Sequence, residues 1–146
     1  MAVCEILPHL WLGDIRSAKN KSFFDDNNIE IVINCTKDIP FFSNYTKNIR
    51  ISVNDNLEEE EIDKFYLYID KGVDLINKEI LNFKNILVHC YAGKQRSASI
   101  ISCYLMKYGN MSLKESIESI KSKRSVAFTP EINFIKSLLR FEKDLL

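Results

Sequence analysis

The sequence predicts an α/β fold in which a central, mostly parallel, twisted sheet of four to five strands is flanked by helices. Short apolar runs rich in Val and Ile alternate along the chain with longer segments of helical periodicity, a pattern typical of parallel strands joined by crossover helices. The 146 residues have the length of one domain, and the sequence contains no repeat or Pro/Gly-rich linker that divides it. We therefore expect a single domain over residues 1–146.

The predicted strands are short, rich in β-branched residues and bounded by polar or glycine-containing segments. They are expected at residues 6–12, 30–34, 48–53 and 86–89. The last strand, Ile-Leu-Val-His, is apolar up to its final residue, as in a strand buried on both faces. Ligands of parallel sheets bind beyond the carboxyl ends of the strands, so the segment after His89 is the first place to look for a functional site.

The predicted helices lie between and after the strands, at residues 17–28, 62–83, 97–107, 112–122 and 129–145. The second helix carries apolar residues at alternating steps of three and four, which places them on one face. Acidic residues 58–61 stand at its start, where the helix dipole favours negative charge. In the last helix, Thr129 is expected as the N-cap and Pro130 as the first helical residue.

Composition and charge exclude several classes of protein. The 20 basic and 20 acidic side chains cancel, which argues against a protein that coats nucleic acid or an anionic membrane. The chain start has no signal-peptide pattern, and no apolar run approaches the roughly 18 residues that span a bilayer. The four cysteines form no CxxC pair and no metal-ligand cluster. We expect free thiols in a reducing compartment, and an intracellular, cytoplasmic protein that is a monomer.

The segment from His89 to Ser97 has the three parts that a phosphate site needs. These are backbone N–H groups on a short loop, a helix N-terminus behind them and a fixed positive charge. Five residues separate Cys90 from Arg96, enough to wrap a loop around a tetrahedral oxyanion. Gly93 permits a backbone conformation that a Cβ atom would forbid, and the Arg96 guanidinium can bind two phosphate oxygens at once.

Cys90 is the expected nucleophile of this loop. Backbone N–H dipoles and a guanidinium both favour the thiolate over the thiol, and a thiolate at the floor of a phosphate cradle can attack phosphorus in line to form a phosphocysteine. The hydroxyl group of Ser97 can hydrogen-bond the sulfur and help it to leave in the second step. His89 is expected to orient the loop through hydrogen bonds rather than to donate a proton.

The run from His89 to Ser97 resembles the HCxxGxxRS signature of cysteine-dependent protein phosphatases, and the chain resembles the small dual-specificity phosphatases over nearly its whole length. Residues 6–13 and 31–36 are similar to the first two strands of that family, and residues 124–134 with 138–139 to its closing segment. The resemblance implies the cysteine-phosphatase fold, activity on phosphotyrosine and phosphoserine or phosphothreonine of phosphoprotein substrates, and no metal or other cofactor.

The resemblance also implies roles for individual residues outside the nucleophile. Asp55 matches the general acid, which protonates the leaving group and then activates water. Asp63 is a competitor, although it falls within a predicted helix. Substrate binding is implied for the loop and for a basic residue near the chain's end; these residues are Tyr91, Ala92, Gly93, Lys94, Gln95, Arg96 and Arg124.

Two loop residues depart from the pattern of the family. Lys94 and Gln95 stand where many members carry small uncharged residues, and a second cation resembles the loops of phosphatases that act on phosphoinositides. A phospholipid substrate is therefore an alternative to a phosphoprotein. A catalytically weak phospho-binding module is a second alternative, although Cys90, Arg96, Ser97 and Asp55 are retained together.

Overall fold

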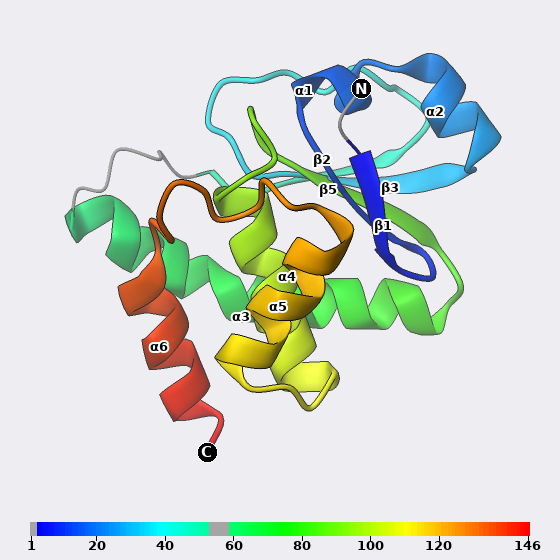
Figure 1. Cartoon of the computed structure of the whole chain (residues 1–146). Helices are drawn as coiled ribbons and strands as arrows, with labels where there is room; N and C mark the ends of the chain where they lie inside the picture. Colours follow the sequence, from blue (N-terminus) through cyan, green and yellow to red (C-terminus); the bar gives the residue numbers. More distant parts are fainter. Residues whose placement is uncertain (1–2, 53–58) are drawn as a thin grey trace.

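The computed structural model describes residues 3–52 and 59–146, and its centre is a five-stranded sheet (Figure 1). The strand order is β1-β2-β5-β3-β4, with β1 antiparallel to β2 and the other neighbours parallel. The strands are β1 Val3–Leu7, β2 Leu10–Gly13, β3 Ile29–Asn34, β4 Lys47–Arg50 and β5 Asn85–His89. This arrangement confirms the predicted mostly parallel sheet.

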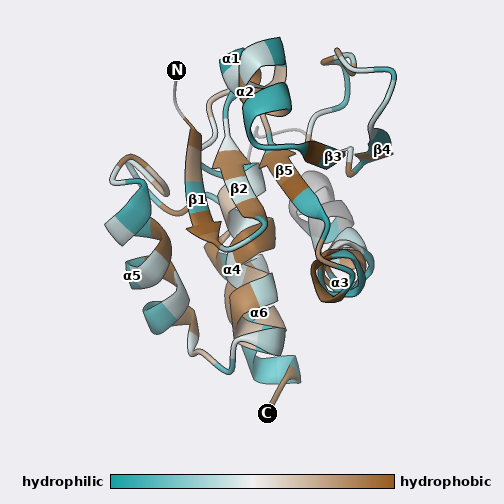
Figure 2. Cartoon of the chain, turned by 90° about the vertical axis from the view of Figure 1, so that its right-hand side faces the viewer, coloured by the Kyte–Doolittle hydropathy of each residue, from teal (hydrophilic) through white to brown (hydrophobic). Residues whose placement is uncertain are grey.

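Helices cover both faces of the sheet (Figures 1 and 2). They are α1 Ile15–Ala18, α2 Lys21–Asp26, α3 Glu59–Leu81, α4 Arg96–Tyr108, α5 Leu113–Lys123 and α6 Ile135–Asp144. The two short helices pack on one face, where Phe23 and Phe24 contact Val32 and Leu87. The four longer helices cover the other face, with α4 at the centre of the larger core. None of the described helices is long and apolar enough to cross a membrane.

The first predicted strand, residues 6–12, is wrong as a single strand, because the chain reverses within it. β1 and β2 form a hairpin around Pro8 and His9, and His9 adopts a positive φ of 76°. The ring nitrogen Nδ1 of His9 lies 2.7 Å from Oδ1 of Asn85, which ties the turn to the start of β5. The apolar residues on both sides of the turn form one continuous pattern, so the pattern conceals the reversal.

Two helix predictions also need correction. The helix predicted over residues 17–28 is two helices, because the side chain of Asn20 accepts a hydrogen bond from Phe23 N at 2.8 Å and starts α2 anew. The last helix begins at Ile135 rather than at Thr129. The backbone between these residues bonds instead to the side chain of Gln95. The other predicted helices and strands are confirmed to within a few residues.

Candidate active site

The loop of residues 90–95 joins the central strand β5 to the most buried helix, α4. β5 lies between β2 and β3 in parallel register, and His89 pairs with Gly13 on one side and Asn34 on the other. The loop therefore emerges at the carboxyl edge of the sheet, where the sequence predicts a site. The strand, the loop and the helix N-terminus follow one another as the predicted phosphate site requires.

Cys90 and Ser97 face each other across the floor of this loop. The side chain of Cys90 is almost fully buried, at 2% exposure, and its Sγ atom lies 3.1 Å from Oγ of Ser97. Ser97 is the second residue of α4 and is fully buried. The arrangement places the hydroxyl group of Ser97 within hydrogen-bond distance of the sulfur; its help to a leaving thiolate stays a prediction.

Gly93 makes the tight curve of the loop. Its φ is +66°, and a Cβ atom there would lie 2.6 Å from the carbonyl oxygen of Gly13. Ile15 N, two residues after Gly13, donates to Tyr91 O at 3.0 Å, so the start of α1 supports the loop directly. This support was not predicted from the sequence. A signal was present, because Asp14 is a residue type that favours the N-cap of a helix, and it caps α1 by accepting a hydrogen bond from Ser17 N at 3.0 Å.

The carbonyl groups of the loop are bonded on its outer side. Arg124 donates from Nε to Gly93 O at 2.8 Å and from Nη2 to Ala92 O at 2.9 Å, and Phe128 N donates to Lys94 O at 2.7 Å. Arg124 is only 6% exposed. The loop thus occupies two N–H groups of the Arg124 guanidinium, and the contact of Arg124 with a substrate stays a prediction.

The side chain of Gln95 bonds to the segment that follows Arg124. Its side chain is buried and points to residues 129–133, where Nε2 donates to Thr129 O at 3.0 Å and to Glu131 O at 2.7 Å. Its Oε1 atom accepts from Asn133 N at 3.0 Å. These bonds engage both the donors and the acceptor of the side-chain amide, and a substrate contact of Gln95 stays a prediction.

The remaining loop residues differ in exposure. Tyr91 is 63% exposed and Ala92 is exposed beside it, whereas Lys94 and Arg96 are partly buried. Arg96 is the first residue of α4. Within residues 3–52 and 59–146, no protein partner accepts a hydrogen bond from the N–H groups of residues 91–95. A loop with outward carbonyls and unused amides can bind a tetrahedral oxyanion.

His89 and Cys35 lie beneath the loop and stay uncharged. Burial lowers the pKa of His89 to about 4, so its ring is neutral near pH 7 and carries no imidazolium proton for acid catalysis. Its Nδ1 lies 3.4 Å from Cys90 O, and its own carbonyl accepts from Cys35 N at 2.8 Å. Burial raises the pKa of the Cys35 thiol, and negative charge on Cys90 raises it further. Cys4, Cys35, Cys90 and Cys103 are all free thiols.

Of the two candidate general acids, Asp63 lies within the described residues and Asp55 does not. Asp55 lies outside the described residues, so its role stays a prediction. Asp63 lies in α3 and is exposed. No group of three or more His, Cys, Asp or Glu side chains within the described ranges could hold a metal ion.

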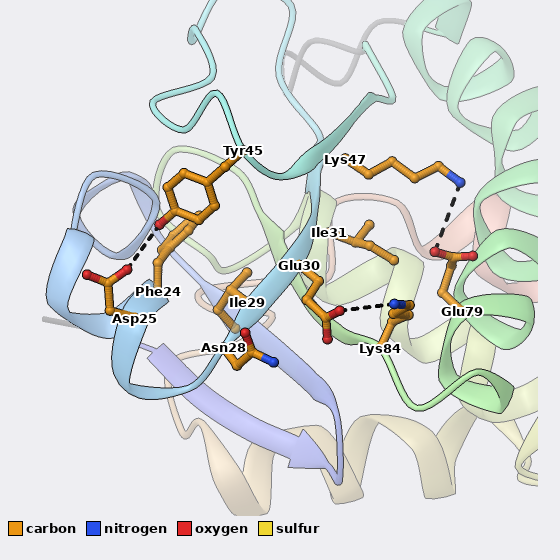
Figure 3. A pocket seen from close by; sticks show the side chains of 10 residues that line it. All are labelled: Phe24, Asp25, Asn28, Ile29, Glu30, Ile31, Tyr45, Lys47, Glu79 and Lys84. Atoms are coloured by element: carbon orange, nitrogen blue, oxygen red, sulfur yellow. Dashed lines mark hydrogen bonds and ion pairs between the residues drawn. The ribbon is translucent and has the colours of Figure 1, made fainter.

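A cavity of about 540 Å³ lies away from Cys90, at the amino ends of β3 and β4 (Figure 3). Ion pairs cross it, Lys84 to Glu30 at 3.1 Å and Lys47 to Glu79 at 4.0 Å. β3 rises about 3.3 Å per residue, so its length separates the cavity from the Cys90 edge by roughly 17 Å. The cavity therefore takes no part in the chemistry of the loop.

The chain matches known proteins over almost all of its length. The model of the dual specificity phosphatase catalytic domain matches residues 10–144. Human dual specificity protein phosphatase 16 is 38% identical over 96% of this chain, which spans 21% of that protein. Dual specificity protein phosphatase 1B of Arabidopsis thaliana is 31% identical over 97% of this chain and 82% of its own length.

The fold agrees with these sequence matches. The crystal structure of human DUSP28 aligns with a TM-score of 0.87 at 23% identity and covers 98% of this chain and 94% of that one. The chain spans about a fifth of the length of dual specificity protein phosphatases 8 and 16 from mammals.

Proposed function

The chain belongs to the dual specificity phosphatase family, as a cysteine-dependent phosphatase, and we propose that it hydrolyses phosphotyrosine and phosphoserine or phosphothreonine in proteins through a phosphocysteine intermediate. The observation that carries this proposal is the loop around Cys90, whose carbonyls bond outward and whose sulfur lies 3.1 Å from the Ser97 hydroxyl. Its features match the requirements of phosphoryl transfer, which are positioning and charge complementarity rather than a cofactor.

In the first step the Cys90 thiolate attacks phosphorus opposite the leaving oxygen. The S–P bond forms as the P–O bond to the substrate breaks, and the carboxylic acid of Asp55 gives its proton to the departing oxygen. Arg96 and the loop amides stabilise the charge on the three equatorial oxygens. The products are the dephosphorylated side chain, a phosphocysteine and the Asp55 carboxylate.

In the second step water hydrolyses the phosphocysteine. The Asp55 carboxylate takes a proton from the attacking water, the new P–O bond forms, and the S–P bond breaks to release phosphate and the thiolate. The Ser97 hydroxyl donates a hydrogen bond to the sulfur as negative charge returns to it, which makes the sulfur a better leaving group. Neutral His89 holds its place beneath the loop and transfers no proton.

The test is hydrolysis of an aryl phosphate, a phosphotyrosine peptide and a phosphothreonine peptide by the wild type and by Cys90→Ser, with EDTA and reductant present. We expect turnover of all three by the wild type and none by the variant. Turnover that survives Cys90→Ser would overturn the proposal. Binding of phosphopeptides without any turnover would identify the chain as a phospho-binding module instead.

A phosphoinositide substrate is the second candidate, and Lys94 is the residue that favours it. Lys94 is partly buried in the loop, and its ammonium group has no hydrogen bond or ion pair among the described residues. A ligand that carries a second phosphate, as a phosphoinositide does, would use this charge. If phosphoinositides are the substrate, Lys94→Ala will lower kcat/KM for them far more than for phosphopeptides; equal, small losses on both favour the phosphoprotein.

A further inference from the structure

Residues 124–133, which we call the outer brace, run along the side of the catalytic loop that faces away from Cys90. Figure 1 shows this segment in orange between α5 and α6, beside the start of α4. Its hydrogen bonds to the loop come from the Arg124 side chain and from Phe128 N. In the other direction, the Gln95 side chain bonds to the backbone of residues 129–133. The brace and the loop are thus joined along the whole curve of the loop.

Gln95 suits this connection because its amide carries both donors and an acceptor. Two backbone carbonyls and one N–H group of the brace meet it, and a carboxylate of the same shape would face the two carbonyls with no proton to donate. Gln95 is also the N-cap residue of α4, yet its side chain makes no capping bond to the helix. The Gln95 side chain therefore takes no part in capping α4, and the peptide that carries Arg96 is held by the brace.

Arg124 acts on the middle of the loop. Its planar guanidinium bonds two successive carbonyls, those of Ala92 and Gly93, a geometry that the single ammonium of Lys reproduces only in part. These bonds turn both carbonyl dipoles away from Cys90. The buried positive charge of Arg124 also lies behind the loop, where it favours negative charge at the centre.

We propose that Gln95 and Arg124 are positioning residues, which act through the outer brace to hold the loop in its oxyanion-binding shape before any ligand arrives. This inference rests on the proposed function. Gln95, which departs from the pattern of the family, then serves to preorganise the loop. Arg124, which the sequence predicts to bind substrate, has the same role. Neither side chain touches the substrate.

The test is inhibition by orthovanadate, which takes up the geometry of the transferred phosphoryl group, together with kcat/KM on an aryl phosphate. Arg124→Met and Gln95→Leu keep the size of each side chain and remove its polar atoms. Lys121→Met is the matched control, because Lys121 Nζ donates to Ser125 O and Ala127 O of the same brace without contacting the loop. Thermal unfolding of each variant shows whether it is folded at the temperature of the assay.

We expect vanadate inhibition to weaken by about tenfold to a hundredfold in Arg124→Met and Gln95→Leu, the effect of losing hydrogen bonds that support a charged site. Arg124→Lys should recover part of this loss, and Lys121→Met should match the wild type within about twofold. Folded Arg124→Met and Gln95→Leu with vanadate inhibition equal to that of the wild type would overturn the inference.

Gln95→Glu keeps the inference testable if the apolar variants fail to fold. Its carboxylate repels the two brace carbonyls when ionised, and gains a proton to donate as pH falls towards its ordinary pKa of about 4.3. The ratio of its activity to that of the wild type should therefore rise between pH 7 and pH 5; a ratio independent of pH would contradict the inference. If the wild type binds vanadate without turnover, the proposed function fails, while vanadate affinity still tests the brace.

Discussion

Replacement of Gly93 by Ala should damage both stability and activity, because the structure leaves no room for a methyl group. The new Cβ would lie 2.6 Å from Gly13 O and 2.8 Å from Gly13 C, and 3.0 Å from Nη2 of Arg124. The positive φ of 66° costs a non-glycine residue about 1–2 kcal/mol. Relief of the clash with a backbone adds about 1–3 kcal/mol, so we expect a loss of about 2–5 kcal/mol.

Urea unfolding followed by circular dichroism measures this loss of stability. Aryl phosphate hydrolysis, assayed without urea where the variant is fully folded, measures the effect of displacing the loop. A shift of about 1 Å in a catalytic group lowers the rate by about a hundredfold. Gly72→Ala is the control, because the near contact of its Cβ, at 2.6 Å, is the flexible end of the Ile51 side chain, and Ile100 Cδ1 lies at an ordinary 3.8 Å. Position 72 also lies within a helix, which prefers Ala to Gly. A Gly93→Ala protein with wild-type stability and activity would refute the reasoning.

Three further results are expected. Ser97→Ala should show a burst of product and then a steady-state rate lower by about 10- to 100-fold, because the leaving sulfur loses its hydrogen bond; stopped-flow kinetics without a burst would contradict this. Asp55→Asn should slow alkyl phosphates by about 10²- to 10⁴-fold and activated aryl phosphates much less, and equal losses would remove Asp55 as the acid. Because burial lowers the pKa of His89 from 6.5 to about 4, the unfolded chain takes up a proton that the folded chain does not. Unfolding free energy should therefore fall by about 3 kcal/mol as pH drops from 6.5 to 4, a slope that His89→Asn should lack.

The parts of the fold that follow from hydrophobic periodicity were predictable from the sequence. The apolar residues of α3 recur at steps of three and four, which predicts a helix with one apolar face. The continuous apolar run of β5 predicts a strand that is buried on both faces. The hairpin at His9 was not predictable from periodicity, because its reversal depends on one left-handed residue. The start of α6 was missed since Thr129 and Pro130 match a helix start locally, while contacts with the distant Gln95 decide the outcome.

In the candidate site, too, the arrangement of residues close in sequence was predictable, whereas contacts between distant residues were not. Cys90, Gly93, Arg96 and Ser97 lie within one short stretch of chain, so their spacing predicts their arrangement. Arg124, by contrast, bonds to carbonyl groups of residues that lie about thirty positions earlier in the sequence. A sequence pattern does not show which distant residues meet in the folded chain.

Acid-quenched mass spectrometry of the protein during turnover tests the central claim most directly. We predict one phosphoryl group on the peptide that contains Cys90, a larger amount in Ser97→Ala and none in Cys90→Ser. Phosphate release with no phosphorylated Cys90 peptide in either the wild type or Ser97→Ala would contradict the account.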